Sequence, residues 1–159
     1  MLRTFVLIVV ATLVTAPTRS AVADEPAVTL VVVVAKDAKV TSLSRADLKR
    51  AFSGEATTAG GVRLVPFNLP PSSDERARFD RIILGMAPSA VGRYWVDRKI
   101  RGGSGAPRAL PSATYVVKVV AKFPGAIGYL PASQVTSGVK VIAIDGDLPG
   151  QAGYPLGAR

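Results

Sequence analysis

The segment Val28–Ala35 is a nearly unbroken run of β-branched residues, most of them valine. Such a run, without regular alternation of polar positions, is typical of a strand whose two faces are both covered. Such strands belong to parallel or mixed sheets that have helices packed against them. The segment therefore predicts an interior strand of an α/β domain.

The sequence SLSRADLKRAFSG carries the signals that begin and end a helix. Ser44 is placed to cap the first turn, and Asp47 follows three residues later, as in a capping box. Leu43 and Leu48 stand where two apolar side chains pack across a helix start. Gly54 is of the type that commonly ends a helix, because glycine readily adopts the left-handed conformation.

A second strand and helix are predicted next. Val62–Phe67 predicts the strand, and the loop Asn68–Pro71 leads into the sequence SSDERARFDRIILGM. Ser72 or Ser73 is suited to cap the helix there. Its apolar residues have the spacing of one buried face, namely Phe79, Ile82, Ile83 and Met86. Its polar face is expected to carry Arg76, Asp80 and Arg81.

The rest of the chain continues the alternation of helix and strand. We expect a third helix from Pro88, a fourth from Ser112 to Phe123, and a turn at Pro124-Gly125. Val91, Tyr94 and Trp95 are the residues expected to be buried on the third helix. Ala126–Leu130 predicts a buried strand in which Gly128 lets another backbone or a ligand come close, and Val139–Ile144 predicts a final strand. The predicted class is α/β, with a mainly parallel or mixed sheet flanked by helices.

The N-terminal residues have the layout of a secretory signal peptide. Arg3 precedes an apolar run from Phe5 to Ala16, and the small-residue site Ala21-Val22-Ala23 follows. The run is short for an ordinary membrane-spanning helix, so removal is favoured over an uncleaved anchor. We expect a signal peptide over residues 1–23, a single domain over 24–144 and an irregular or disordered tail over 145–159. The localisation predicted is periplasmic or secreted, without membrane insertion after cleavage.

Composition excludes several kinds of chemistry. The chain has no cysteine and no histidine, which removes thiolate and imidazole ligands and nucleophile–base pairs. No metal, no cofactor and no enzymatic activity are therefore expected. The formal net charge of +9 is compatible with attraction to anions, or simply with solubility. Nucleic-acid binding is not expected, because aromatic residues do not interleave with the basic ones.

With these elements in order, the sequence resembles the substrate-binding proteins of phosphate ABC transporters. The resemblance rests on SLSRADLKRAFSGEATTAGG, the serine-headed helix, Tyr94-Trp95, the Gly-rich loop and KFPGAIGYL, and it covers about Val28 to Ile144. FPGAIGY is the strongest of these pieces, above all together with LSRADLKRAFSG upstream. The resemblance implies one lobe of a type II periplasmic-binding fold, whereas the transporter proteins close two lobes around the anion.

The resemblance also implies an anion site at a helix N-terminus. In the family, an arginine and a Gly-Ser-Gly-Thr-like run present backbone N–H groups to phosphate there. Aligning Phe79 with the family's aromatic residue places Leu69 near the arginine, and Ser73 matches in type. The implied ligand-binding residues for phosphate or another small anion are Ser72, Ser73, Asp74 and Arg76. The family's arginine is missing, and the acids Asp74 and Glu75 replace glycine and threonine, so helix capping without a ligand is the alternative.

A second candidate site is the loop RGGSGAPR, from Arg101 to Arg108. Gly103 and Ser104 are its candidate ligand-binding residues, because flexible amides beside two arginines can form an anion nest. The loop resembles the family's Gly-rich loop, and a plain exposed loop is the alternative, since it does not follow a strand and open a helix. Asp145-Gly146-Asp147 lacks the further acids of a calcium loop and predicts a turn.

Two functions follow from these observations. The first is a non-enzymatic, exported, solute-binding-like protein that holds a small anion around Ser72-Ser73. The second is an interaction module that kept the fold of the lobe, lost its ligand and binds a protein partner or a second copy of itself.

Overall fold

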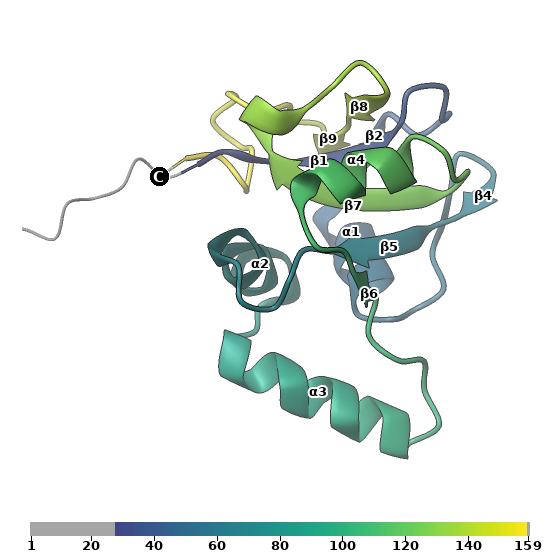
Figure 1. Ribbon diagram of the computed structural model, residues 1–159, viewed down its shortest axis with the longest axis vertical. Coiled ribbons are helices and arrows are strands. Elements are labelled where there is room, and N and C mark those ends of the chain that lie inside the picture. The colour runs from purple at the N-terminus through teal and green to yellow at the C-terminus, as the bar shows by residue number, and fades with distance from the viewer. Residues whose placement is uncertain (1–27, 159) are drawn as a thin grey trace, which may run out of the picture.

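A five-stranded mixed sheet is the centre of the computed structural model, which describes residues 28–158 (Figure 1). The strand order is β6-β5-β7-β1-β8. These strands are β1 Leu30–Ala35, β5 Val65–Asn68, β6 Arg108–Ala109, β7 Ala126–Pro131 and β8 Val139–Val141. The expected signal peptide lies outside the described residues.

β1 is an interior strand, as its valine run predicts, and all of its residues are buried. It pairs antiparallel with β7 on one side, where Val32 lies opposite Tyr129, and antiparallel with β8 on the other. β5 is parallel to both β6 and β7. Of the two sheet types expected, parallel and mixed, the structure therefore has the mixed one.

The remaining strands form two small sheets. One is parallel and the other antiparallel: β2 Ser42–Leu43 with β9 Ala143–Ile144, and β3 Thr58–Ala59 with β4 Val62–Arg63. The strands predicted as continuous at Val62–Phe67 and Val139–Ile144 are each interrupted by one residue. The interrupting residues, Leu64 and Ile142, are buried, so the chain changes sheet where an apolar side chain enters the core.

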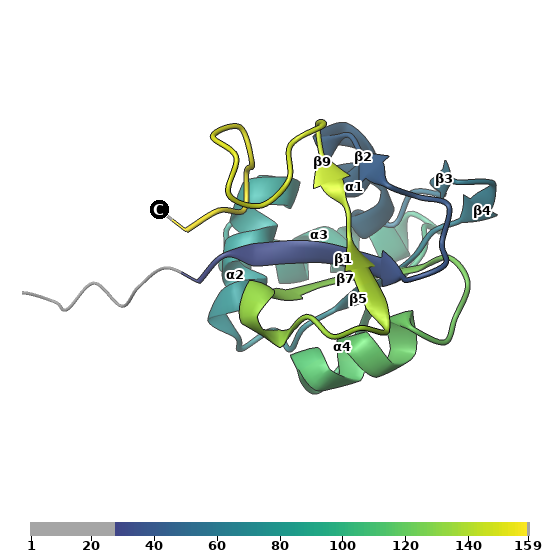
Figure 2. The same cartoon turned by 90° about the horizontal axis from the view of Figure 1, so that it is seen from above.

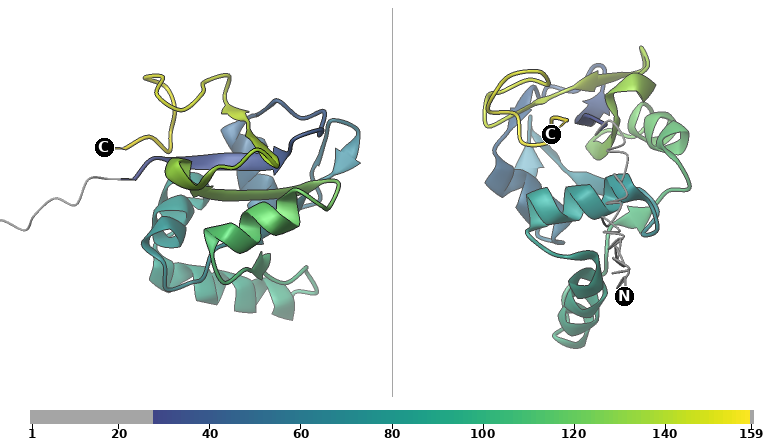
Figure 3. Two further views of the ribbon diagram at one scale, coloured as in Figure 1. Left: turned by 45° about the horizontal axis from the view of Figure 1, so that its top comes forward. Right: turned by 90° about the vertical axis from the view of Figure 1, so that its left-hand side faces the viewer.

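Helices cover both faces of the sheet. They are α1 Arg45–Phe52, α2 Asp74–Phe79 with the π-helical continuation η1 Asp80–Leu84, α3 Pro88–Ile100, α4 Ala113–Val120 and the short 3-10 helix η2 Ala132–Gln134. α4 lies on one face, and α1 and α2 lie on the other (Figures 1 and 2). α3 projects from the body (Figure 3). No helix within residues 28–158 is long and apolar enough to cross a bilayer.

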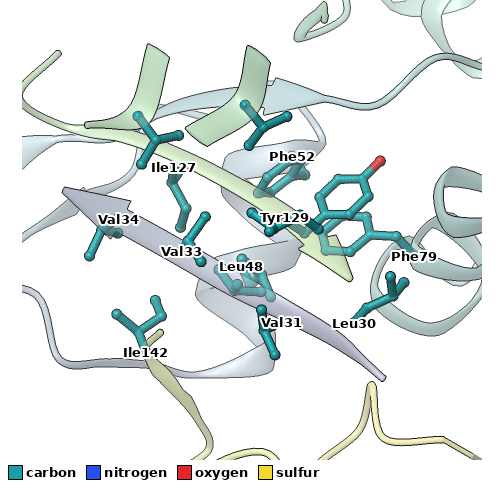
Figure 4. Close-up of a cluster of buried hydrophobic side chains, with 14 of the residues drawn as sticks. Leu30, Val31, Val33, Val34, Leu48, Phe52, Phe79, Ile127, Tyr129 and Ile142 are labelled. Atoms are coloured by element: carbon teal, nitrogen blue, oxygen red, sulfur yellow. The ribbon is translucent and has the colours of Figure 1, made fainter. Parts of the chain in front are cut away.

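The interior on the α1 side is built around three aromatic rings (Figure 4). The rings of Phe79 and Tyr129 stack with centroids 3.8 Å apart, and Phe52 meets Phe79 edge-on at 4.7 Å. On the opposite face, Gly128 leaves room for α4, because a β-carbon there would lie 2.5 Å from Cγ1 of Val116. The prediction was another backbone or a ligand close to this glycine, whereas the nearest neighbour in the structure is a helix side chain.

The C-terminal residues are irregular but packed. Residues 148–158 contain turns and no helix or strand, yet Tyr154 and Leu156 are buried. The N–H of Leu30 donates to the carbonyl of Leu156 at 3.0 Å, and the Tyr154 hydroxyl donates to the carbonyl of Leu30 at 3.1 Å. This segment therefore belongs to the folded body, and its irregular backbone is held by the start of β1.

Candidate functional site

The expected anion site lies where β5 passes through a loop into α2. Ser73 is the N-cap, and its Oγ accepts a hydrogen bond from the backbone N–H of Arg76 at 3.1 Å. Ser72 and Asp74 are exposed, and Asp74 and Glu75 stand in the first turn, where acids offset the helix dipole. Of the two possible caps, the structure uses Ser73, and its side chain is engaged within the chain.

Arg76 and Asp80 are buried, so their expected placement on a polar helix face is wrong. Nε of Arg76 lies 2.7 Å from Oδ2 of Asp80, and Nη1 donates to the carbonyl of Leu69 at 3.4 Å. Neutralisation of each charge by the other permits this burial, which neither side chain would tolerate alone. The third residue of the expected polar face, Arg81, is exposed.

This buried ion pair is imperfectly satisfied. Oδ1 of Asp80 has no hydrogen-bond partner among the described residues. Burial raises the pKa of Asp80 above its ordinary value, and the charge of Arg76 offsets this rise only in part. Burial also raises the pKa of Tyr129, whose hydroxyl accepts from the N–H of Leu69 at 3.4 Å. The loop before α2 is therefore fixed to the core by Arg76 and Tyr129.

The Gly-rich loop is attached to the end of α1. The hydroxyl of Ser104 and Nη2 of Arg98 each donate to the carbonyl of Gly54 at 2.7 Å, and the N–H of Gly103 donates to the carbonyl of Arg98 at 2.9 Å. Gly54 has φ +85°, and a β-carbon there would lie 2.8 Å from Oγ of Ser104. Both the conformation and the space at this position therefore require glycine.

The structure does not bring the two candidate sites together. α2, which begins after Ser73, lies near the N-terminal end of α3, whereas the loop with Gly103 and Ser104 follows the C-terminal end of α3 (Figure 1). A helix of the length of α3 is about 20 Å long. Ser104 lines a hollow of about 480 Å³ with Arg63 and Arg108, and no residue from Ser72 to Arg76 lines that hollow.

Two further expectations concern aromatic and acidic residues. Three residues of α3 were expected to be buried. Val91 is buried, whereas Tyr94 and Trp95 are only partly buried, because α3 projects from the body.

Asp145 forms a turn with φ 54°, and its Oδ1 accepts from the N–H of Arg45 at 2.8 Å. Residues 28–158 contain no cluster of three or more potential metal-ligating side chains.

Sequence reasoning missed one feature, a groove between the edge strand β6 and helix α4. Its volume is about 580 Å³, and its main lining residues are Phe67, Arg108, Leu110, Tyr115, Val119 and Phe123. We call it the β6–α4 groove. The signal was present in the spacing of Tyr115 and Val119, which places both on one side of a helix, next to the buried Val116 and Val120. The helix predicted to reach Phe123 ends at Val120, and Phe123 lines the groove from the turn that follows.

The fold is similar to that of phosphate transport receptors. The ABC-type phosphate transport receptor of Vibrio cholerae matches with a TM-score of 0.61 and 17% identity, over 78% of this chain and 50% of that protein. A putative phosphate ABC transporter substrate-binding protein with bound phosphate from Clostridium perfringens matches with a TM-score of 0.61 and 18% identity, over 78% and 49%. PstS from Borrelia burgdorferi matches with a TM-score of 0.59 and 13% identity, over 81% and 54%.

These similarities confirm the fold implied by the sequence resemblance. The chain has the α/β fold of one lobe of these proteins, and it spans about half of their length. No protein-family model matches the sequence, and no curated protein does. Sequence identities below a fifth establish the shared architecture alone, because function depends on particular side chains at the site.

Proposed function

We propose that this chain is a non-enzymatic, exported binding protein of the solute-binding type, which acts through contact with a protein partner and does not capture phosphate on its own. The solute-binding-like fold supports the class, and the signal-peptide pattern of residues 1–23 supports export. The neighbours named as phosphate receptors are about twice as long as the matched region. A single lobe supplies only part of a site that a longer protein can enclose.

The observation that carries the proposal is the buried pair of Arg76 and Asp80. Arg76 is the arginine nearest in sequence to Ser72 and Ser73, and only 6% of its surface is exposed. Its guanidinium already contacts a carboxylate and the carbonyl of Leu69. An incoming phosphate would have to replace both contacts, and it would meet Asp74 and Glu75 at the same helix start.

Small-anion binding remains a second candidate, and the phosphate-bound Clostridium perfringens neighbour favours it. The site would use the backbone around Ser72, Ser73 and Asp74, where the N-terminus of α2 carries partial positive charge. Gly103 and Ser104 would form a separate site, because Ser104 is bonded to Gly54 after α1 and Gly103 to Arg98 of α3.

Calorimetric titration of residues 24–159 with phosphate, at low and moderate salt, tests the proposal, with light scattering on the same sample to establish the oligomeric state. We expect no heat of binding and no thermal shift at millimolar phosphate. Micromolar binding by a monomer would overturn the proposal. In that event, Ser73→Ala should weaken binding if the start of α2 is the site, whereas Ser112→Ala, at the N-cap of α4, serves as the matched control.

A further inference from the structure

The β6–α4 groove combines an exposed apolar stripe with a free sheet edge. Tyr115 of α4 and Phe123, in the turn after α4, are 50% and 60% exposed, and Val119 of α4 lines the same groove. Large aromatic side chains that are at least half exposed in one hollow are unusual on a surface that only meets water. The stripe therefore favours contact with another molecule.

β6 is the edge strand of the five-stranded sheet, and both of its residues are exposed. Its inner side pairs with β5, where Phe67 lies opposite Arg108. Its outer side faces no other strand among the described residues. An edge of this kind offers backbone donors and acceptors to an extended segment, and the neighbouring groove receives alternate side chains of that segment.

The charged side chain that lines the groove is basic. It is Arg108, which also lines the neighbouring hollow together with Arg63 and Glu55. Lys118 of α4 lies 5.5 Å from the ring centroid of Tyr115. No acidic residue lines the groove itself. A second copy would bring Arg108 against another basic groove, so charge complementarity favours an acidic partner.

We propose that the β6–α4 groove binds an extended acidic segment of a partner protein. The segment adds to β6 as a further strand, rests apolar side chains on Tyr115 and Phe123, and directs acidic side chains to Arg108 and Lys118. This inference rests on the proposed function, since it gives the contact surface and the chemistry of the partner. It uses none of the residues at the start of α2.

The test is titration of residues 24–159 with a short capped peptide in which glutamate and leucine alternate, followed by anisotropy and by amide shifts. We expect saturable binding, with the largest amide shifts at Arg108 to Leu110. A peptide with lysine in place of glutamate should bind at least about tenfold more weakly, as should the glutamate peptide with methylated backbone nitrogens. Equal affinity for the glutamate and lysine peptides would overturn the proposal.

Matched variants separate the groove from general charge and hydrophobicity. Arg108→Glu should weaken binding of the glutamate peptide at least about tenfold, whereas Lys99→Glu on α3 changes the net charge equally and should leave binding unchanged. Tyr115→Ala should weaken binding, whereas Ile100→Ala removes a large exposed side chain elsewhere and should not. Equal effects within either pair would contradict the assignment.

Other occupants give different results. If the wild type is a dimer that Tyr115→Ala converts to a monomer, a second copy fills the groove and the proposal is overturned. If neither the glutamate peptide nor phosphate binds the wild-type protein, the groove proposal is overturned, whereas the proposed function is not. Tight phosphate binding by the monomer, with peptide binding intact, would overturn the proposed function alone.

Discussion

Arg76 and Asp80 form a pair whose stability depends on both members being present. Asp80→Asn should lower the free energy of unfolding by about 3 kcal/mol or more, because it leaves the buried guanidinium without its counter-charge. The double variant Arg76→Met with Asp80→Leu should be at least as stable as wild type, because it removes both desolvated charges. Urea unfolding followed by circular dichroism measures both.

The two variants together decide what the pair contributes. The unpaired Oδ1 and the raised pKa of Asp80 both indicate that the contact with Arg76 does not fully offset the cost of removing the carboxylate from water. If the double variant were as unstable as Asp80→Asn, the pair would be a net source of stability, and its burial would need a different explanation.

At the scale of the element, the cap at Ser73 is a local feature with a measurable contribution. Ser73→Ala should lower the free energy of unfolding by about 1 kcal/mol, because the N–H of Arg76 loses its acceptor. Ser112 is the N-cap of α4 but makes no side-chain cap bond, so Ser112→Ala should change stability much less. Thermal unfolding compares the two, and equal losses would mean that the cap bond at Ser73 is not what stabilises α2.

Features that depend on neighbours in the chain could be predicted from the sequence. The cap at Ser44, which accepts from the N–H of Asp47 at 3.0 Å, and the burial of β1 both follow from local pattern. The burial of Arg76 and Asp80 did not, because an arginine and an aspartate four residues apart are typical of an exposed helix face. Around the pair, Arg76 donates to the carbonyl of Leu69, seven residues earlier, and Tyr129 of β7 lies about fifty residues later in the chain. Both reach the pair only when the chain folds.

At the scale of the whole molecule, the two expected ligand sites serve the architecture. Ser73 caps α2, Arg76 donates to the loop before α2, and Ser104 attaches the loop after α3 to Gly54. The β6–α4 groove, by contrast, combines exposed aromatic side chains with a sheet edge. A resemblance to a family indicates where that family's ligand-binding residues fall in this sequence, whereas the groove is lined by residues of β5, β6 and α4 that come together only in the folded chain.

The C-terminal segment links the stability of the whole molecule to alkaline pH through Tyr154. Burial raises the pKa of Tyr154 from 10.0 to about 12. Between these values the folded protein holds a proton that the unfolded chain releases, so the stability falls as the pH rises through this window. The expected loss from this one group is about 2 kcal/mol.

Tyr154→Phe isolates this contribution. At neutral pH the variant should be less stable by about 1 kcal/mol, because the hydrogen bond to the carbonyl of Leu30 is lost. Between pH 10 and 12 its stability should fall less steeply than that of wild type, since phenylalanine has no proton to release. Tyr115→Phe, at a half-exposed position, controls for loss of a hydroxyl. Parallel losses in wild type and Tyr154→Phe, measured by urea unfolding across this range, would show that the segment does not hold Tyr154 in the core.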